Sequence, residues 1–398
     1  MTVTSTPSDQ RIEVLDVLRG FALGGILLAN ILWLSGYLLA PATVRAALHA
    51  HPLDQCFLFF TRLLVHGKSY SIFSFLFGLG VAVQMLRAEE RQKAGFIARY
   101  GRRLFVLFLI GWAHAYFLWW GDILRFYALI GAFLLLFRRA SDRTLLTVAL
   151  LSLLAPVLLA ALRDAGWMEM SAAMSRRTAK PLVVLANGDW AAFRDYNLAM
   201  IAEHALTNFS DGRVLKIFGL FLLGLYCGRS GFLDRLRGDR TYLRQLLLWS
   251  GLIGISASLL RVAETYGVIR RIESDLFDQV LYLFAVYPLA AAYVALIALG
   301  CQRAGSQRAL RWLAPVGKMA LSNYLFHSIA AAAVFHWWGL GLAGRVPLRY
   351  CYALALLILV AQTIGSALWL RRFHYGPLEW IWRTLTRLQP APLWRSER

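Results

Sequence analysis

Two residues whose side chains can move protons lie close together in one apolar stretch of the chain. His114 follows Arg103 after ten residues with no ionisable side chain, and Asp122 comes eight residues later. A helix that enters a membrane at Arg103 carries His114 roughly 16 Å inward, at about 1.5 Å per residue, just past the middle of a core about 30 Å thick. Gly121 allows the backbone to bend, so the Asp122 carboxylate can turn back toward His114 or pair with Arg125.

An imidazole oriented by a carboxylate is the usual arrangement of a general base, because histidine takes up and returns protons near neutral pH. His114 and Asp122 are therefore the candidate catalytic residues. In the alternative interpretation, His114 donates one hydrogen bond to a neighbouring helix and Asp122 caps the helix that follows it. Membrane depth favours the functional interpretation, since ionisable groups are costly there.

A second polar group lies in the first hydrophobic segment. Asp16 and Arg19 are three residues apart, so they share a helix face and can form an ion pair. Asn30 lies eleven residues beyond Arg19 and returns to nearly the same angular position. This stripe is a candidate substrate-binding surface; alternatively, the ion pair supports insertion and packing, and Asn30 forms a contact between helices.

Two later segments carry polar residues inside apolar sequence. Lys68 stands at the start of one, with Ser74 six residues further on. In 317–328, Lys318 shares a helix face with a serine four residues on, and Asn323 does so with His327. Lys68, Ser74, Lys318 and Asn323 are candidate substrate-binding residues. A lysine at a helix end also extends naturally to the interface, and buried amides hold helices together, so both interpretations stay open.

No metal site is predicted. The four cysteines form no CxxC pair and no Cys/His spacing typical of zinc or an iron–sulfur cluster: Cys56, Cys227, Cys301 and Cys351. Structural disulfides are not expected either.

The composition indicates a membrane protein. Hydrophobic residues make up 59% of the 398 residues, more than a globular core and a wetted surface together accommodate. The net charge of +20 comes from Lys and Arg that cluster between the apolar segments rather than on one continuous face. Nucleic acid is therefore not an expected partner, and the lipid bilayer is.

The fold class expected is all-α, a polytopic integral membrane protein of about ten transmembrane helices. The predicted spans are 12–36, 53–86, 103–120, 123–138, 143–163, 214–229, 244–262, 276–300, 316–338 and 350–372. The second is too long for one simple span, and Gly67 with Lys68 should divide an interfacial helix, 53–66, from the crossing, 69–86. The third and fourth should form a hairpin with a tight turn at Gly121 and Asp122.

The distribution of basic residues predicts the orientation. With the N-terminus inside, the cytoplasmic segments carry 24 Lys and Arg, whereas the outer segments carry 15 despite including the longest loop. This bias places both termini in the cytoplasm, and the first span, which lacks a signal peptide's basic start, should remain in the bacterial inner (plasma) membrane as part of a multi-pass protein.

One membrane domain over 1–398 is expected. It has an N-terminal helical half, about 12–163, an outer loop, 164–213, and a C-terminal helical half, about 214–388. The spacing of Trp190, Phe193, Tyr196 and Met200 predicts a short amphipathic helix that caps the outer surface.

Several stretches together resemble the YeiB-like family of bacterial membrane proteins, also called domain of unknown function 418. They occur in order along the chain: LDVLRGFALGGILLANI (15–31), GKSYSIFSFLFGLG (67–80), YGRRLFVLFLIGWAHAYFLWWGDILRFYAL (100–129), GKMALSNYLFHS (317–328) and FHYGPLEWIWR (373–383). The main departure is His327, where we expect a glutamine in many relatives, so the resemblance gives no support for a catalytic role of that histidine.

The LD..RG start of the first helix is also similar, more distantly, to transmembrane acyltransferases such as heparan-glucosaminide N-acetyltransferase. This resemblance implies an acyltransferase that takes an acyl group from cytoplasmic acyl-CoA and transfers it to an extracytoplasmic hydroxyl or amine on a glycan or lipid acceptor. It implies acyl-CoA as co-substrate, with no bound cofactor. Arg102 and Arg103 could then hold the CoA phosphates. The alternatives are a small-solute transporter, since buried ionisable groups also serve proton relays, and a non-enzymatic protein that binds lipid or a partner.

Overall fold

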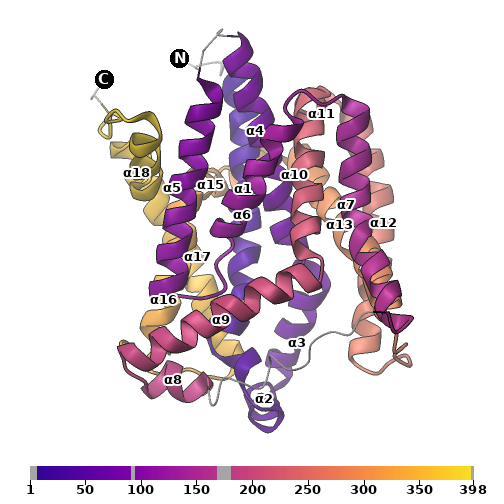
Figure 1. Ribbon diagram of the computed structural model, residues 1–398, viewed down its shortest axis with the longest axis vertical. Helices are drawn as coiled ribbons and strands as arrows, with labels where there is room; N and C mark the ends of the chain where they lie inside the picture. Colours follow the sequence, from indigo (N-terminus) through magenta and orange to yellow (C-terminus); the bar gives the residue numbers. More distant parts are fainter. Residues whose placement is uncertain (1–6, 91–94, 168–180, 396–398) are drawn as a thin grey trace.

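In the computed structural model, residues 7–90, 95–167 and 181–395 are described, and their regular structure is helical apart from an isolated bridge between Phe373 and Trp394 (Figure 1). The predicted all-α fold class is confirmed. The elements are α1 Pro7–Leu34, η1 Tyr37–Leu39, α2 Ala42–Leu48, α3 Pro52–Phe60, η2 Thr61–Val65, α4 Lys68–Glu90, α5 Phe96–Phe117, α6 Leu124–Phe133, η3 Leu134–Phe137, α7 Asp142–Asp164, α8 Pro181–Asn187, α9 Trp190–Ser210, α10 Arg213–Arg229, α11 Phe232–Gly238, α12 Arg240–Thr265, α13 Asp275–Cys301, α14 Ala304–Leu310, α15 Leu313–Lys318, α16 Ala320–Phe335, α17 Leu348–Arg372 and α18 Pro377–Arg387.

Six helical segments of the described chain are long and apolar enough to cross a membrane: Glu13–Leu34, Pro52–Glu90, Asp142–Asp164, Arg240–Thr265, Asp275–Cys301 and Leu348–Arg372. The pair α10 and α11 passes the same test but is bent by 71°, and the 124–137 and 320–335 helices are shorter. Large apolar side chains point outward from several of these helices, including Leu136 (75% exposed) and Leu357 (65% exposed). Such a surface is stable against lipid rather than water, so the chain is a membrane protein.

The long helices lie side by side and divide the molecule into two ends (Figure 1). Both chain termini lie at one end, together with α11 and α18; we call it the termini end. The short helices α2, α3 and α8 lie at the opposite end, which α9 crosses at an angle to the bundle; we call it the α9 end.

A helix boundary lies at the predicted place in the second hydrophobic segment, while the division into an interfacial helix and a crossing stays a prediction. The chain runs from α3 into the π-helical turn η2, which ends at Val65, and Gly67 at φ +84° precedes the start of α4 at Lys68; Pro52–Glu90 still forms one long apolar segment. Only glycine adopts such a φ at low cost, which is why the break occurs at this residue.

Two boundaries in the polar segments differ from the prediction. The helix that carries His114 ends at Phe117 rather than at 120, and residues 118–123 connect it to α6. Lys318 does not lie inside a continuous helix with Asn323, because α15 ends at Lys318 and α16 begins at Ala320. Lys318 is consequently exposed at a break between two helices, and the stripe that would join it to position 322 does not form.

The predicted amphipathic helix is present as α9. Phe193, Tyr196 and Met200 are buried against the bundle, while Trp190 remains partly exposed. Part of the predicted outer loop, residues 168–180, lies outside the described residues.

Candidate functional site

Both ring nitrogens of His114 make hydrogen bonds. Nδ1 lies 2.8 Å from Oδ2 of Asp122, and Nε2 lies 2.8 Å from Oγ of Ser328. With Asp122 ionised, the Nδ1–H donates to the carboxylate, which leaves Nε2 to accept from the serine hydroxyl. We call these three residues the Ser–His–Asp cluster. The order hydroxyl, imidazole, carboxylate is the one that activates a hydroxyl for nucleophilic attack.

The last turn of α5 and the turn that follows it position the first two residues. The backbone carbonyl of His114 accepts from Leu118 N and Trp119 N, which ends the helix and turns the chain back. Gly111, three residues before His114, lets the start of α6 come close: a Cβ there would lie 2.6 Å from Arg125 N and 2.8 Å from Asp122 Oδ1. The missing side chain at Gly111 therefore makes room for the carboxylate beside the imidazole.

Asp122 makes the contacts expected in both interpretations of the sequence, one with His114 and one with the start of α6. While Oδ2 binds His114, Oδ1 accepts from the backbone N of Arg125 at 3.0 Å and thereby caps α6. The Arg125 guanidinium does not pair with Asp122; it donates to the carbonyl of Trp120 at 3.1 Å. Gly121 has no left-handed φ, and its lack of a side chain accommodates the Trp119 ring, 2.3 Å from where a Cβ would lie.

Ser328 comes from α16 and was not singled out by the sequence. Tyr324, one turn earlier on the same helix face, lies with its ring centroid 5.2 Å from that of His114. Its hydroxyl accepts from Ile123 N at 3.4 Å. The sequence signal for Ser328 is its spacing of four residues from Tyr324, which places two hydroxyl groups on one face of the 317–328 helix.

The cluster is closed from solvent. His114 is 1% exposed, Asp122 is 0% and Ser328 is 2%. Neither of two surface cavities, one at each end of the bundle, is lined by any of the three. Asn197 of α9 donates to the carbonyls of Ala115 and Tyr116, which fastens α9 over the end of α5. Access for a substrate therefore requires movement of the helices around the cluster.

A second residue of α9, His204, also packs against the chain that follows α5. His204 packs edge-on against Trp120 and Phe126, at 5.3 and 5.6 Å between ring centroids. Burial lowers the pKa of His204 to about 3, and the charges of Arg213 and Arg125 act in the same direction. His204 is therefore neutral at physiological pH and contributes as an aromatic side chain.

The polar stripe of α1 is confirmed in its first part. Arg19 donates to Asp16 at 2.9 Å, and the Asp16 side chain is buried against protein. Lys318 is close enough for its charge to act on Asp16, so two cations accompany one carboxylate near the termini end. Asn30 is half-buried further along α1.

Arg102 and Arg103 hold α18 onto the bundle. Arg102 donates to the carbonyl of Thr386 at 3.0 Å. The Arg103 guanidinium lies 4.1 Å from the ring centroid of Trp382 and donates to Gln84 at 3.0 Å. The structure thus assigns these two arginines contacts within the protein.

Lys68 and Ser74 are both buried. The Lys68 ammonium donates to the carbonyl of Leu63 at 2.9 Å, at the end of the π-helical turn. The Ser74 hydroxyl bonds to Tyr70 O at 2.8 Å and to the hydroxyl of Tyr127. Neither lies in the Ser–His–Asp cluster.

Asn323 and His327 join α16 to α17. The side-chain amide of Asn323 donates to Ser366 Oγ at 2.9 Å, and the backbone carbonyl of Asn323 accepts from the Gln362 amide at 2.8 Å. His327 Nε2 lies 2.7 Å from the Gln362 oxygen. These contacts are those of buried polar groups that hold helices together.

Comparison with known proteins shows likeness over nearly the whole chain. The family model described as "Protein of unknown function (DUF418)" matches residues 227–389. "Uncharacterized protein YxaH" of Bacillus subtilis is 32% identical over 98% of this chain and 97% of its own length. "Uncharacterized protein YeiB" of Escherichia coli is 27% identical over 96% and 98%, respectively. No solved structure matches.

Proposed function

The chain belongs to the YeiB-like DUF418 family of membrane proteins, and from that premise we propose that it is a transmembrane acyltransferase. It would move an acyl group from cytoplasmic acyl-CoA to an extracytoplasmic hydroxyl or amine. The observation that carries the proposal is the Ser–His–Asp cluster. The same order of groups serves acyl transfer on unrelated folds, which makes its geometry, rather than the fold, the argument.

The first half-reaction forms an acyl-enzyme. His114 Nε2 takes the proton of Ser328 as the serine oxygen attacks the thioester carbonyl of acyl-CoA. The carbon–sulfur bond then breaks, and the imidazolium returns its proton to the departing thiolate. The products are an ester on Ser328 and free CoA.

The second half-reaction releases the acyl group. The acceptor hydroxyl or amine attacks the Ser328 ester while His114 takes the acceptor's proton. Collapse breaks the bond to the serine oxygen, which receives that proton from the imidazolium. Asp122 remains ionised throughout, orients the ring and stabilises the imidazolium that forms twice per turnover.

The proposal includes an orientation in a bacterial inner membrane. The termini end faces the cytoplasm, in agreement with the 24-to-15 bias of basic residues. The ten crossings are the six long segments together with α5, α6, α10 and α16. Acyl-CoA then approaches from the termini end, and the glycan or lipid acceptor from the α9 end.

Two basic residues are available to acyl-CoA at the termini end. Lys318 is exposed, and the Arg19 side chain is 30% exposed while it pairs with Asp16. Their remaining donors can contact CoA phosphates. Asn30, Lys68, Ser74 and Asn323 lie deeper and would act on substrate only through helix movement, while Arg102 and Arg103 retain their contacts with neighbouring helices.

Trapping of the acyl-enzyme tests this function. Purified protein is incubated with a series of labelled acyl-CoA thioesters without acceptor, quenched in acid and analysed by peptide mass spectrometry. We expect one acyl group on Ser328, none in Ser328→Ala, and unchanged labelling in Ser152→Ala, which removes a buried hydroxyl from α7. If no acyl-CoA donates an acyl group while vesicles take up a solute in a His114-dependent way, the transporter function replaces this one.

A further inference from the structure

A cavity of about 320 Å³ opens at the α9 end, between η2 and the end of α12. Gln55, Leu58 and Arg62 line one side, and Thr265 and Tyr266 line the other. The Arg62 guanidinium lies 5.5 Å from the centroid of the Tyr266 ring. Tyr37 and His49 complete the lining, so the Arg62 cation lies among two tyrosine rings, an imidazole and neutral hydrogen-bonding groups.

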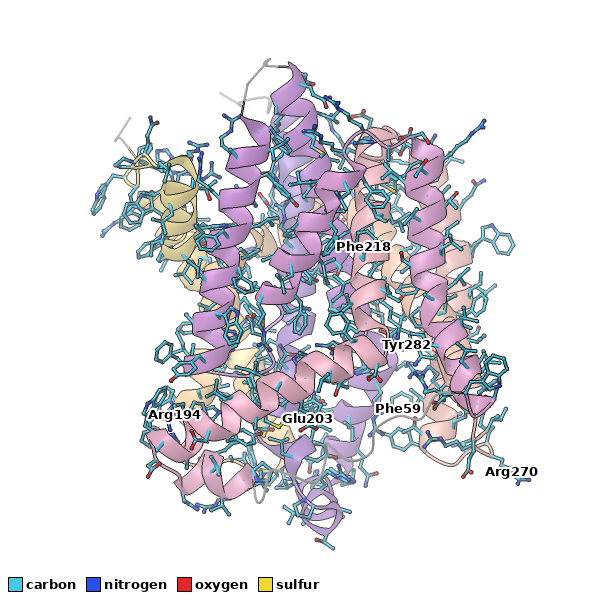
Figure 2. All side chains as sticks on the ribbon, viewed as in Figure 1. Phe59, Arg194, Glu203, Phe218, Arg270 and Tyr282 are labelled. Atoms are coloured by element: carbon cyan, nitrogen blue, oxygen red, sulfur yellow. The ribbon has the colours of Figure 1, made fainter. Side chains whose placement is uncertain are left out.

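More cations lie on the elements next to Arg62, outside the lining of the cavity itself. Charges from four different elements act on the exposed side chain of His66: those of Arg62, Lys68, Arg213 and Arg261. The ring of Tyr282, which Figure 2 shows at the same end of the bundle, contacts two cations. Lys216 Nζ is 4.3 Å and the Arg261 guanidinium is 5.1 Å from its centroid. We call Arg62, Lys68, Arg213, Lys216 and Arg261 the α9-end cation cluster.

Carboxylates do not balance this cluster. In the described part of the chain, none of its five members forms an ion pair, whereas other arginines at this end do, such as Arg271 with Asp278 and Arg349 with Asp54. Lys68 and Lys216 are 1% and 7% exposed, and their hydrogen bonds go to neutral acceptors, the Leu63 carbonyl and the Gln279 amide. The nearby carboxylate of Asp211 acts on Lys216 without forming an ion pair with it.

Such a cluster is costly without an anion. Like charges repel, and partly buried cations lose hydration that carboxylates do not replace here. The local backbone also favours a binding role, because π-helical turns such as η2 are rare and occur frequently at functional sites. Tyr293 donates to Leu64 O at 2.8 Å and Lys68 to Leu63 O, so η2 is held in place and Arg62 is directed toward the cavity.

We infer that this cavity is a binding site for a phosphate group. Guanidinium and ammonium groups both bind phosphate oxygens through charge-assisted hydrogen bonds, and their combination favours phosphate over a single carboxylate. The volume suits a headgroup. The phosphate is therefore that of a lipid headgroup or a free phosphate, and nothing in the inference depends on acyl transfer.

Binding of short-chain ligands to the full-length protein in detergent distinguishes these sources. Dihexanoyl phosphatidylglycerol, inorganic phosphate and the phosphate-free dihexanoylglycerol are compared by thermal shift and native mass spectrometry. We expect a phosphate-bearing ligand to bind with an affinity that falls as salt rises. Binding of phosphatidylglycerol alone identifies the lipid source, and equal binding of inorganic phosphate identifies the free ion.

Variants locate the site. Arg62→Gln should weaken binding by at least about 10-fold, because it removes a charge-assisted hydrogen bond from the lining of the cavity. Arg261→Gln removes a neighbouring positive charge and should weaken binding by a smaller factor. Arg213→Gln changes an exposed side chain and leaves the packed interior unchanged, so it tests the contribution of the cluster without affecting the fold. Arg271→Gln, which removes an exposed cation paired with Asp278, is the control and should bind as the wild type does. Dihexanoylglycerol binding as tightly as phosphatidylglycerol, or all three cluster variants binding normally, would overturn the inference.

Discussion

His114 has two polar atoms, and each has one specific partner. In the proposed mechanism the partners differ in what they supply: Asp122 orients the ring, and Ser328 presents a proton to it. We therefore expect replacement of each residue to change the reaction rate differently, so kinetic measurements can distinguish the roles of the three residues.

Removal of the base should be the more severe change. His114→Ala should lower the rate of acyl transfer by about 10²–10⁴-fold, the usual contribution of general-base catalysis, with acyl-CoA binding largely retained. Asp122→Asn should lower it less, because the ring remains present but is less well oriented. Steady-state transfer and equilibrium binding of acyl-CoA measure the two quantities. Full activity of well-folded His114→Ala would mean that another residue is the base, and His51 and His66 would be the next candidates.

The pair of Asp16 and Arg19 should behave as one unit. Each single removal leaves a charged group without its partner at 2.9 Å, whereas removal of both does not. We expect Asp16→Ala and Arg19→Leu each to destabilise the protein, and the double variant by less than their sum, with a coupling of about 0.5–3 kcal/mol. Thermal unfolding of the wild type, both single variants and the double variant in detergent gives the double-mutant cycle that measures this coupling. Strict additivity would show that the residues are not coupled.

Helix contacts decide whether the proposed catalytic groups meet. The start of α6 lies against α5 at Gly111, and α18 lies against the start of α16. Gly111 permits the close approach of the first pair, and Glu379 links the second pair by hydrogen bonds.

Gly111→Ala should separate His114 from Asp122. The added methyl group would lie 2.8 Å from the Asp122 carboxylate and 2.6 Å from Arg125 N, so α6 must shift at a cost of about 1–3 kcal/mol. Gly101→Ala is the matched control on the same helix, because nothing lies within 4 Å of its Cβ position. We expect activity to fall in Gly111→Ala only. Equal activities in the two variants would contradict this role of the α5–α6 contact.

Glu379 of α18 caps α16, the helix that carries Ser328. Its carboxylate accepts from Leu321 N at 2.7 Å and from Ser322 N and Oγ at 3.1 and 2.6 Å. Glu379→Ala leaves these donors without a partner and should cost about 0.5–2 kcal/mol, whereas Glu379→Gln keeps one acceptor and should cost less. Thermal midpoints of the two variants at one pH compare them.

The same carboxyl group should make stability depend on pH. Burial raises the pKa of Glu379 above its ordinary value of 4.5, so the folded state binds this proton more readily than the unfolded chain. The associated stabilisation is complete below the ordinary pKa and is lost as pH rises through the raised pKa. The midpoint of the wild type relative to Glu379→Gln should therefore fall as pH increases across this window. A difference that stays constant with pH would contradict the raised pKa.

At the scale of the whole molecule, the bundle separates two chemically different ends. The termini end has the exposed Lys318, and the α9 end has the α9-end cation cluster and its cavity. The amphipathic α9, with Arg194 and Glu203 along it in Figure 2, closes that end over the buried cluster.

Reporter fusions test the proposed orientation. A cytoplasmic reporter should be active after residues 90 and 238, and a periplasmic reporter should be active after residue 185. The reason is the larger number of basic residues in the segments at the termini end. A periplasmic reporter active after residue 90, or a cytoplasmic one active after residue 185, would overturn the ten-span orientation.

The sequence by itself determined the features that depend on neighbours along the chain. Apolar stretches of about twenty residues specify membrane helices, because unpaired backbone groups cannot face lipid. The three-residue spacing of Asp16 and Arg19 places them on one face, and Gly67 allows the turn before α4. The turn after His114 likewise brings Asp122 back within eight residues.

Only the tertiary structure decided which distant side chains meet. Ser328 lies 214 residues beyond His114, and its contact depends on how α16 is rotated and how closely it packs. The same holds for Arg102 and Arg103, whose partners come from α18 and α4, and for the α9-end cation cluster, which four elements assemble. Helical periodicity specifies the face on which a residue lies, but the neighbour of that face is chosen by packing across the whole bundle.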